Sequence, residues 1–232
     1  MPFLQASWQD LVMVNWEVSP DLLTPLMPEG CSLDFFEGKT FVSLVAFLFK
    51  ETRVLGMKIP AHVNFEEVNL RFYVRHETDQ GEQRRGVVFV KEFVPRRLIA
   101  WTARNLYQEP YSCLPMSHLR EKQTSGQTKI RYQWGDHWLS GLAGSESKQL
   151  EVGSLQHFIA EHYWGYTSTK GGTRQYRVDH PTWRWRSFDE FQSKIDFVEL
   201  YGEKWTFLGQ KEPTNLFLAV GSEVSVSPWG RL

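Results

Sequence analysis

The alternation of side chains over residues 64–74 constrains the fold more than any other feature of the sequence. Apolar side chains occupy every second position, at Val68, Leu70, Phe72 and Val74. The positions between them carry a carboxylate, an amide, a guanidinium and a phenol, at Glu67, Asn69, Arg71 and Tyr73. A period of two is typical of a β-strand, because successive side chains point to opposite faces of the sheet. We therefore predict a strand in the centre of a sheet, with Glu67, Asn69 and Arg71 pointing into an internal cavity.

The rest of the chain is rich in short β-strand patterns. Further strand-like runs, separated by glycine, proline and polar turns, occupy residues 11–18, 40–49, 86–94, 174–180 and 223–226. Two hairpins are predicted, one around Gly38 and one around residues 124–127.

Only a few short helices are predicted, near residues 20–27, 95–107 and 154–163. Residues 194–226 are expected to hold further β-strands. No repeat, low-complexity segment or linker interrupts the pattern. This favours a single domain over residues 1–232 with a β-dominated, closed architecture.

Composition sets broad limits on the class of protein. The length of 232 residues fits one large all-β domain or two small domains, and the hydrophobic content of 41% provides for a sizeable core. A formal charge of -1 and a pI near 6.7 give no pull toward nucleic acid or an anionic membrane, so we expect neither as a partner.

The sequence also indicates a compartment. No window approaches the roughly 18 apolar residues of a membrane span, and residues 1–5 lack the charged region of a signal peptide. Cys31 and Cys113 lie far apart in the sequence. We therefore expect a cytoplasmic protein with reduced thiols.

Residues 103–111, a helical run that breaks at a proline, hold two further candidate binding residues. Arg104 can hold a carboxylate through two parallel hydrogen bonds, or it can lie on a solvated helix face. Tyr111 can donate a hydrogen bond or a proton to a ligand, or it can pack in the mouth of a cavity with its hydroxyl satisfied. For the polar residues of 64–74, the alternative to ligand binding is a structural ion pair in the wall of the fold.

The histidines give no metal-binding pattern. His157 and His162 are five residues apart and do not share a helical face, and no Cys or acidic residue completes a set, so we expect no metal. Residues 161–164 end a helix in aromatic surroundings, which favours core packing or a subunit interface. No nucleophile elbow, phosphate-binding glycine loop or catalytic cysteine motif is visible, and we expect no cofactor.

Six segments together resemble the YqjF-like family of proteins of unknown function: residues 8–15, 33–38, 64–74, 103–111, 158–166 and 176–181. The resemblance covers nearly the whole chain. It implies the acetoacetate-decarboxylase-like fold, a double-layered, cone-shaped β-barrel with its pocket inside, β-rich (α+β by content) and with a few short helices. It also implies a homo-oligomer. Exposed Trp and Tyr side chains expected in the second half of the chain favour a dimer, which would cover them.

The sequence departs from acetoacetate decarboxylase itself at the catalytic segment. These enzymes carry a Gly-Arg-Glu segment followed by Pro-Lys-Lys, whose first lysine forms a Schiff base. Residues 103–105 match the first segment and residues 110–112 the second, so Tyr111 stands where that lysine would be. The pocket glutamate of the enzymes falls on or beside Glu67. Because a phenol cannot form an imine, we expect no Schiff-base chemistry here.

Two classes of function remain open. The first, which we favour, is a non-catalytic protein that binds a small, carboxylated molecule inside the barrel, through Glu67, Asn69, Arg71, Arg104 and Tyr111. The second is an enzyme, a lyase or a related class, that acts on small carbonyl or carboxylate substrates by general acid–base chemistry. The missing lysine excludes the known route and names no replacement.

Overall fold

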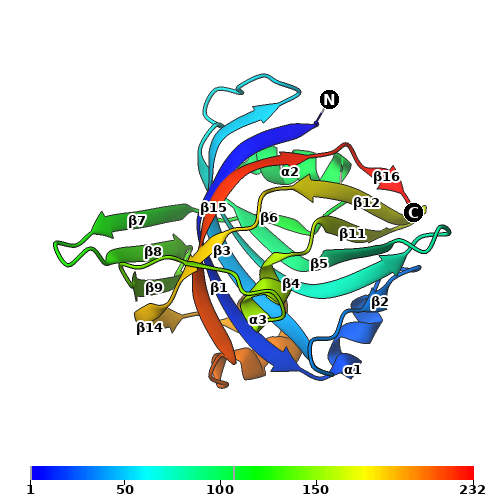
Figure 1. The fold of residues 1–232 in the computed structure, drawn as a ribbon. Helices are drawn as coiled ribbons and strands as arrows, with labels where there is room; N and C mark the ends of the chain where they lie inside the picture. The colour runs from blue at the N-terminus through cyan, green and yellow to red at the C-terminus, as the bar shows by residue number, and fades with distance from the viewer. Residues whose placement is uncertain (1, 107) are drawn as a thin grey trace.

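Twelve strands form one strongly curved sheet in the computed structural model, which describes residues 2–106 and 108–232 (Figure 1). Its main strands are β1 (Leu4–Val18), β3 (Thr40–Val54), β4 (Phe65–Glu77), β5 (Gln83–Val94), β11 (Trp164–Thr169), β12 (Gly172–Asp179) and β15 (Asn215–Val226). Short strands flank them: β2 (Ser32–Leu33), β6 (Tyr111–Cys113), β10 (Lys148–Gln149), β13 (Arg184–Arg186) and β16 (Gly230–Arg231). The order β15-β1-β3-β4-β5-β11-β12 places β4 in the middle, as predicted.

The curved sheet closes on itself. β12 pairs with β11 and also with β15, through Val178 opposite Val226 and Asp179 opposite Ser225. This contact turns the seven main strands into a ring. The inward side chains of the ring therefore face one another across an enclosed space, instead of facing solvent as they would on an open sheet.

A second sheet, of four strands in the described part of the chain, packs on the outer side of the ring. Its strands are β14 (Phe188–Lys194), β9 (His137–Ala143), β8 (Thr128–Trp134) and β7 (Met116–Lys122). Tyr132 and Trp134 of β8 share a buried cluster with Leu70 and Phe72, which point outward from β4. The inward side chains of the ring form a separate cluster. The two faces of β4 thus contribute to two different layers, the outer cluster and the inner cluster. The predicted double-layered, β-rich fold is confirmed.

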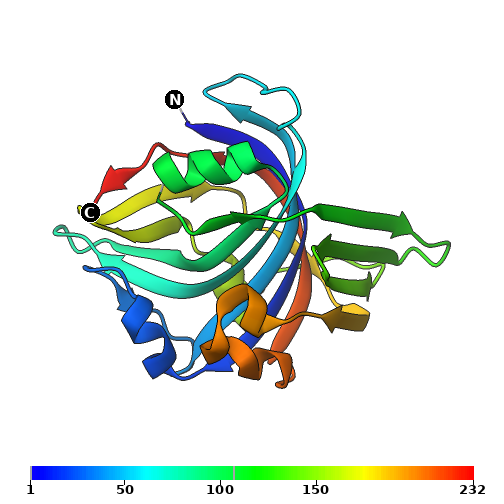
Figure 2. The same ribbon diagram turned by 180° about the vertical axis from the view of Figure 1, so that it is seen from behind.

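The helices lie around the ring: α1 (Pro20–Leu23) followed by η1 (Thr24–Leu26), α2 (Arg97–Leu106), α3 (Leu155–Ala160), α4 (Phe197–Tyr201) and η2 (Glu203–Gly209). Figure 2 shows α2 lying across one end of the ring. The helices predicted near residues 20–27, 95–107 and 154–163 are confirmed, although α3 already ends at Ala160 and Tyr107 lies outside the described residues. Ser154 caps α3 as expected, because its hydroxyl accepts a hydrogen bond from the backbone N–H of His157 at 3.1 Å.

The further β-strand predicted within residues 194–226 is present as β15, but the first part of this segment holds α4 and η2, which were not predicted. Asp196 caps α4 by accepting a hydrogen bond from the backbone N–H of Glu199 at 2.9 Å. Phe197 and Leu200, three residues apart, are both buried. This spacing puts both side chains on one helical face that packs into the outer cluster.

The hairpin predicted around Gly38 is correct only in its turn. Gly38 has a φ of 77°, and two backbone hydrogen bonds of 3.0 Å join Phe36 and Lys39 on either side of it. The segment before the turn, β2, pairs with β4 and not with β3. The hairpin predicted around residues 124–127 is confirmed, since it joins β7 to β8.

Neither membrane-crossing helices nor a disulfide occurs in the described residues. No helix there is both long enough and apolar enough to pass through a bilayer. Cys31 and Cys113 are both free.

Candidate functional site

The inward face of β4 carries three polar residues in a row. Glu67, Asn69 and Arg71 occupy alternate positions of the strand, and their exposed fractions are 3%, 2% and 9%. All three line a cavity of about 270 Å³ inside the ring. The prediction that they point into an internal cavity is therefore confirmed.

Aromatic side chains form much of the wall of this cavity. They come from several strands of the ring and the segments beside it: Trp8, Phe47, Phe49, Phe65, Phe89, Trp164, Tyr176 and Trp183. Small-molecule sites are typically apolar cavities with a few polar groups that fix the orientation of the ligand. The composition and size of this cavity match a site for a small organic molecule.

Two further carboxyl groups join Glu67 at one end of the polar row. Glu92 of β5 lies opposite Asn69 in the ladder between β4 and β5, and Glu109 lies just before β6. Both line the cavity and are 1% and 3% exposed. Glu67 accepts hydrogen bonds from the Asn69 amide and from the Tyr111 phenol, each at 3.0 Å. Glu67, Glu92 and Glu109 are called the carboxyl cluster below.

Burial raises the pKa of every member of the carboxyl cluster. Desolvation raises the pKa of Glu67 to about 7, although its hydrogen bonds partly oppose the shift. Burial and the neighbouring Glu67 and Glu109 raise the pKa of Glu92 well above its ordinary value. Burial raises the pKa of Glu109 to about 8, against hydrogen bonds from Thr167 and Tyr176. Near neutral pH the cluster therefore keeps protons that exposed carboxyl groups have lost.

Several polar atoms around the cavity have no partner among the described residues. They are Nε of Arg71, Oδ1 of Asn69, Oε1 of Glu92 and Oε2 of Glu109. Within the same part of the chain, Arg71 makes no ion pair. Its guanidinium carbon lies 5.9 Å from the centre of the Tyr73 ring. Since folded proteins pair nearly all buried polar atoms, this concentration is typical of a site that a ligand or ordered water completes.

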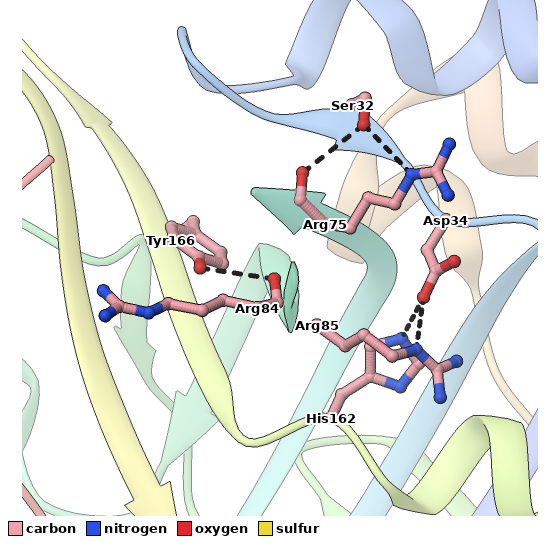
Figure 3. A network of polar contacts seen from close by, with 7 residues as sticks. All are labelled: Ser32, Asp34, Arg75, Arg84, Arg85, His162 and Tyr166. Atoms are coloured by element: carbon pink, nitrogen blue, oxygen red, sulfur yellow. Dashed lines mark hydrogen bonds and ion pairs between the residues drawn. The ribbon is translucent and has the colours of Figure 1, made fainter. Parts of the chain in front are cut away.

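His162 follows α3, lines the cavity and is bound to Asp34, which also binds Arg85 (Figure 3). Its Nε2 lies 3.0 Å from Oδ2 of Asp34, and the same oxygen accepts a hydrogen bond from Nε of Arg85 at 2.7 Å. Burial lowers the pKa of His162 to about 4, despite the hydrogen bond to Asp34. The imidazole is therefore neutral near pH 7. With its Nε2–H donated to Asp34, its Nδ1 is an acceptor that has no partner in the described chain.

The structure brings together four of the five residues predicted to bind a ligand. Glu67, Asn69, Arg71 and Tyr111 all line the cavity. Arg104 does not lie with them: it is exposed on α2, and its Nε donates to the Ala100 carbonyl at 3.2 Å. Its position matches the alternative interpretation, a solvated helix face.

Several polar residues of the cavity were not predicted, among them Glu92, Glu109 and His162. Glu92 and Glu109 were missed although Glu109 lies inside the 103–111 segment. His162 was assigned to core packing or a subunit interface. Its packing against Tyr73 and Phe158 in the core is confirmed, and it also borders the cavity, which was not predicted.

Residues 2–106 and 108–232 contain neither a cluster of metal ligands nor a lysine that lines the cavity. No group of three or more His, Cys, Asp or Glu side chains there is placed to hold a metal ion. No lysine side chain from these residues lines the cavity.

Sequence comparison connects the chain to one family. Residues 5–223 match the model of DUF2071, described as an uncharacterized conserved protein. Among individual proteins, Uncharacterized protein YqjF of Bacillus subtilis (strain 168) is 24% identical over 185 residues, which are 78% of this chain and 74% of that protein. The family match runs from β1 to β15 and so includes every main strand of the ring.

Solved structures share the fold at low sequence identity. Acetoacetate decarboxylase from Legionella pneumophila subsp. pneumophila str. Philadelphia 1 has a TM-score of 0.64 at 12% identity, over 100% of this chain and 86% of that chain. An acetoacetate decarboxylase-like enzyme from Sphingomonas wittichii RW1 also has a TM-score of 0.64 at 12% identity, over 100% and 94%. The enduracididine biosynthesis enzyme MppR complexed with pyruvate has a TM-score of 0.62 at 11% identity, over 97% and 88%. These likenesses confirm the expected acetoacetate-decarboxylase-like fold.

Proposed function

The chain belongs to the DUF2071 family, and we propose that it binds a small carboxylated molecule in the cavity inside its ring of strands. Arg71 is the residue that we expect to hold the carboxylate. Asn69, Tyr111 and the carboxyl cluster are expected to orient the rest of the molecule.

The position of Arg71 carries this proposal. A guanidinium is always charged in a protein, and a buried charge without a partner is costly. Glu67 responds to the charge of Arg71, but the two form no ion pair in the described chain, and Glu67 is only partly ionised at a pKa of about 7. A ligand carboxylate that makes two parallel hydrogen bonds to the guanidinium supplies the missing negative charge.

The surroundings of Arg71 support a ligand of this kind. The aromatic wall suits the apolar part of a small molecule behind its carboxylate. In addition, MppR, which has the same fold, was solved in complex with pyruvate, a small carboxylate. A ligand of that size and charge is therefore compatible with the fold.

Calorimetric titration with straight-chain carboxylates from acetate to hexanoate tests the proposal. We expect Arg71→Gln to weaken binding by roughly 10–100-fold, since hydrogen bonds to a charged group contribute about 1.5–3 kcal/mol. Arg104→Gln is the matched control, because Arg104 is exposed on α2 outside the cavity. Thermal unfolding shows whether each variant is folded.

Two results would contradict the proposal: no binding of any of these carboxylates, or equal affinity in the wild type and a folded Arg71→Gln. Weaker binding in Arg104→Gln instead would support the prediction made for Arg104 from the sequence.

One observation favours a second candidate, an enzyme of the lyase or a related class that works by general acid–base chemistry. With pKa values of about 7 and about 8, Glu67 and Glu109 can each give or take a proton near neutral pH. Perturbed carboxyl groups in a cavity are typical of active sites. Such an enzyme should exchange the protons next to the carbonyl of small 2-oxo acids with D₂O, and NMR would follow this exchange. Exchange that persists in Glu67→Gln and Glu109→Gln would argue against these roles.

Neither candidate function uses an imine. Tyr111 stands at the position of the lysine and has no amine nitrogen with which to form an imine. Burial and the neighbouring Glu67 also raise the pKa of Tyr111, so its phenol stays protonated. We predict that borohydride treatment with acetoacetate leaves the mass of the protein unchanged. A covalent adduct detected by mass spectrometry would contradict this prediction.

A further inference from the structure

The carboxyl cluster has oxygen atoms for which the described chain supplies no donor. The donors of Asn69, Tyr111 and Thr167 already bond Glu67 or Glu109. Three oxygens of residues that are 1–3% exposed remain unpaired: Oε1 of Glu92, Oε2 of Glu109 and Oδ1 of Asn69. An ammonium group has three N–H donors and no acceptor, which complements these oxygens.

Arg71 presents the opposite charge at the other end of the same row. Glu67 and Arg71 are four residues apart on β4, which separates their Cα atoms by about 13 Å along the strand. Arg71 lowers the pKa of Glu67 through its charge, yet the two make no ion pair in the described chain. Because both line one cavity with aromatic walls, the opposite charges face a common space. A ligand with a charge at each end fits this arrangement.

A zwitterion satisfies both ends of the cavity at once. Each charge that leaves water for a buried site costs several kcal/mol unless it meets an opposite charge. A simple carboxylate pairs with Arg71 but leaves the unpaired oxygens of the cluster without donors. A simple amine pairs with the cluster but leaves Arg71 without an anion.

We propose that the cavity takes a small zwitterion, an amino acid whose amine and carboxylate are separated by a short carbon chain. The carboxylate lies against Arg71, the ammonium group against Glu67, Glu92 and Glu109, and the carbon chain against the aromatic wall. An ammonium group favours ionised carboxyl groups, so binding releases a proton from the cluster to solvent. This inference rests on the proposed function, because Arg71 holds the carboxylate in both.

Three probes of equal length separate the contributions of the two charges: pentanoate, pentylamine and 5-aminopentanoate. In calorimetric titrations, 5-aminopentanoate should bind at least about tenfold more tightly than either of the others, which corresponds to about 1.4 kcal/mol. Titration in two buffers with different ionisation enthalpies should show proton release with 5-aminopentanoate and none with pentanoate. The same titrations with 4-aminobutanoate and 6-aminohexanoate determine which chain length spans the two ends.

Variants of the cluster connect the effect to named residues. Glu92→Gln should weaken 5-aminopentanoate binding at least about tenfold more than it weakens pentanoate binding. Glu109→Gln is an independent second variant if Glu92→Gln does not fold. Glu66→Gln is the matched control, because Glu66 is next to Glu67 on β4 but points to the other face, where its carboxylate lies 2.7 Å from Nδ1 of His118.

The outcomes separate this inference from the proposed function. Pentanoate binding that depends on Arg71, with no gain from the amine at any chain length, overturns the zwitterion and leaves the proposed function standing. Pentylamine binding as tight as that of 5-aminopentanoate also overturns the zwitterion, since Arg71 then takes no part. No binding by any of the carboxylates overturns both.

Discussion

Burying Glu67, Glu92 and Glu109 around one cavity makes the stability of the protein depend on pH. Because their pKa values are raised, the folded chain keeps protons where the unfolded chain, with a pKa of about 4.3, has lost them. This contribution to stability is lost as the pH rises through the folded values. His162 acts in the opposite sense. Its pKa of about 4 lies below the ordinary 6.5, so between these two values the unfolded chain holds a proton that the folded chain has lost, and the contribution of His162 to stability grows as the pH rises toward 6.5.

We predict that the free energy of unfolding falls between about pH 6.5 and 8.5, and that the fall is smaller in Glu109→Gln. Each proton held only by the folded chain changes this free energy by about 1.4 kcal/mol per pH unit. Urea unfolding at three pH values in this range measures the slope. Glu66→Gln, on the outer face of β4, is the control. Equal slopes in the wild type and Glu109→Gln would show that Glu109 ionises normally in the folded protein.

The residues of the cavity differ in how visible they are in the sequence. On β4 the period of two is unbroken, so its polar residues can be assigned to one face from the sequence alone. On β5 a bulge leaves Val90 without a partner on β4. Phe89 and Glu92, three residues apart, therefore both line the cavity, which simple alternation does not predict. Glu109 and His162 lie between regular elements, where no periodicity marks a face.

At the scale of the elements, glycines allow β11 to pack closely against its two neighbours, β5 and β12, because each glycine leaves room for an aromatic ring. A Cβ atom on Gly86 of β5 would lie 2.5 Å from the ring of Tyr166 and 2.6 Å from the carbonyl oxygen of Trp164. A Cβ atom on Gly165 of β11 would lie 2.3 Å from the ring of Tyr176 on β12. Tyr176 in turn hydrogen-bonds Glu109. The packing of β11 and the geometry of the cavity are therefore linked.

We predict that Gly165→Ala lowers the free energy of unfolding by about 1–3 kcal/mol, because Tyr176 must move to admit the methyl group. Urea unfolding measures this change. Gly230→Ala is the control, since a Cβ atom there meets no atom within 4 Å. If both variants unfold at the same urea concentration as the wild type, the close contact at Gly165 does not affect stability and the prediction is wrong.

Strands with a long apolar or alternating run of residues could be predicted from the sequence, whereas elements with a short run could not. The runs predicted at residues 11–18, 40–49 and 86–94 lie in long strands of the ring, and the run at 64–74 does so from Phe65 onward. The helices α4 and η2 were not predicted, because a short apolar run has the same appearance in a buried helix and in a buried strand. Their helical state depends on the outer face of the ring, which offers a surface for the helices to cover.

At the scale of the whole molecule, the exposed aromatic surface expected in the second half is mostly absent. Trp134, Trp183 and Trp205 are buried, whereas Trp229 is 39% exposed. A group of exposed apolar side chains instead occupies the β3–β4 connection and α2: Leu55, Met57, Ile59, Leu98 and Trp101. Ile59 and Leu98 also line the cavity. This group, called the mouth patch below, therefore reaches the cavity through Ile59 and Leu98.

We predict a homodimer that covers the mouth patch, since contiguous exposed apolar patches are typical of interfaces. Sedimentation velocity at micromolar concentration should show a dimer for the wild type and a monomer for Trp101→Glu. Val152→Glu is the control, because Val152 is 88% exposed but lies outside the patch. A wild type that sediments as a monomer at every concentration would refute the prediction.

The closure of the ring could not be derived from local patterns. It depends on two residue pairs between β12 and β15, nearly fifty positions apart in the chain, and on β1, whose Leu4 pairs with Val226. Alternation shows that a segment is a strand and which side chains share a face, but it does not show which strands become neighbours. The architecture was instead implied by the resemblance to a family.

The two faces of β4 have different roles, and this affects which substitutions the fold can accept. Leu70 and Phe72 hold the two layers together, while Glu67 and Arg71, on the other side of the same strand, touch only the cavity and its wall. Substitutions on the inner side can accumulate without disturbing the packing between layers. Solved structures with this architecture share only 10–12% of their residues with the chain, at TM-scores of 0.61–0.64. The same architecture therefore exists with very different side chains, and the architecture by itself does not determine the chemistry of the cavity.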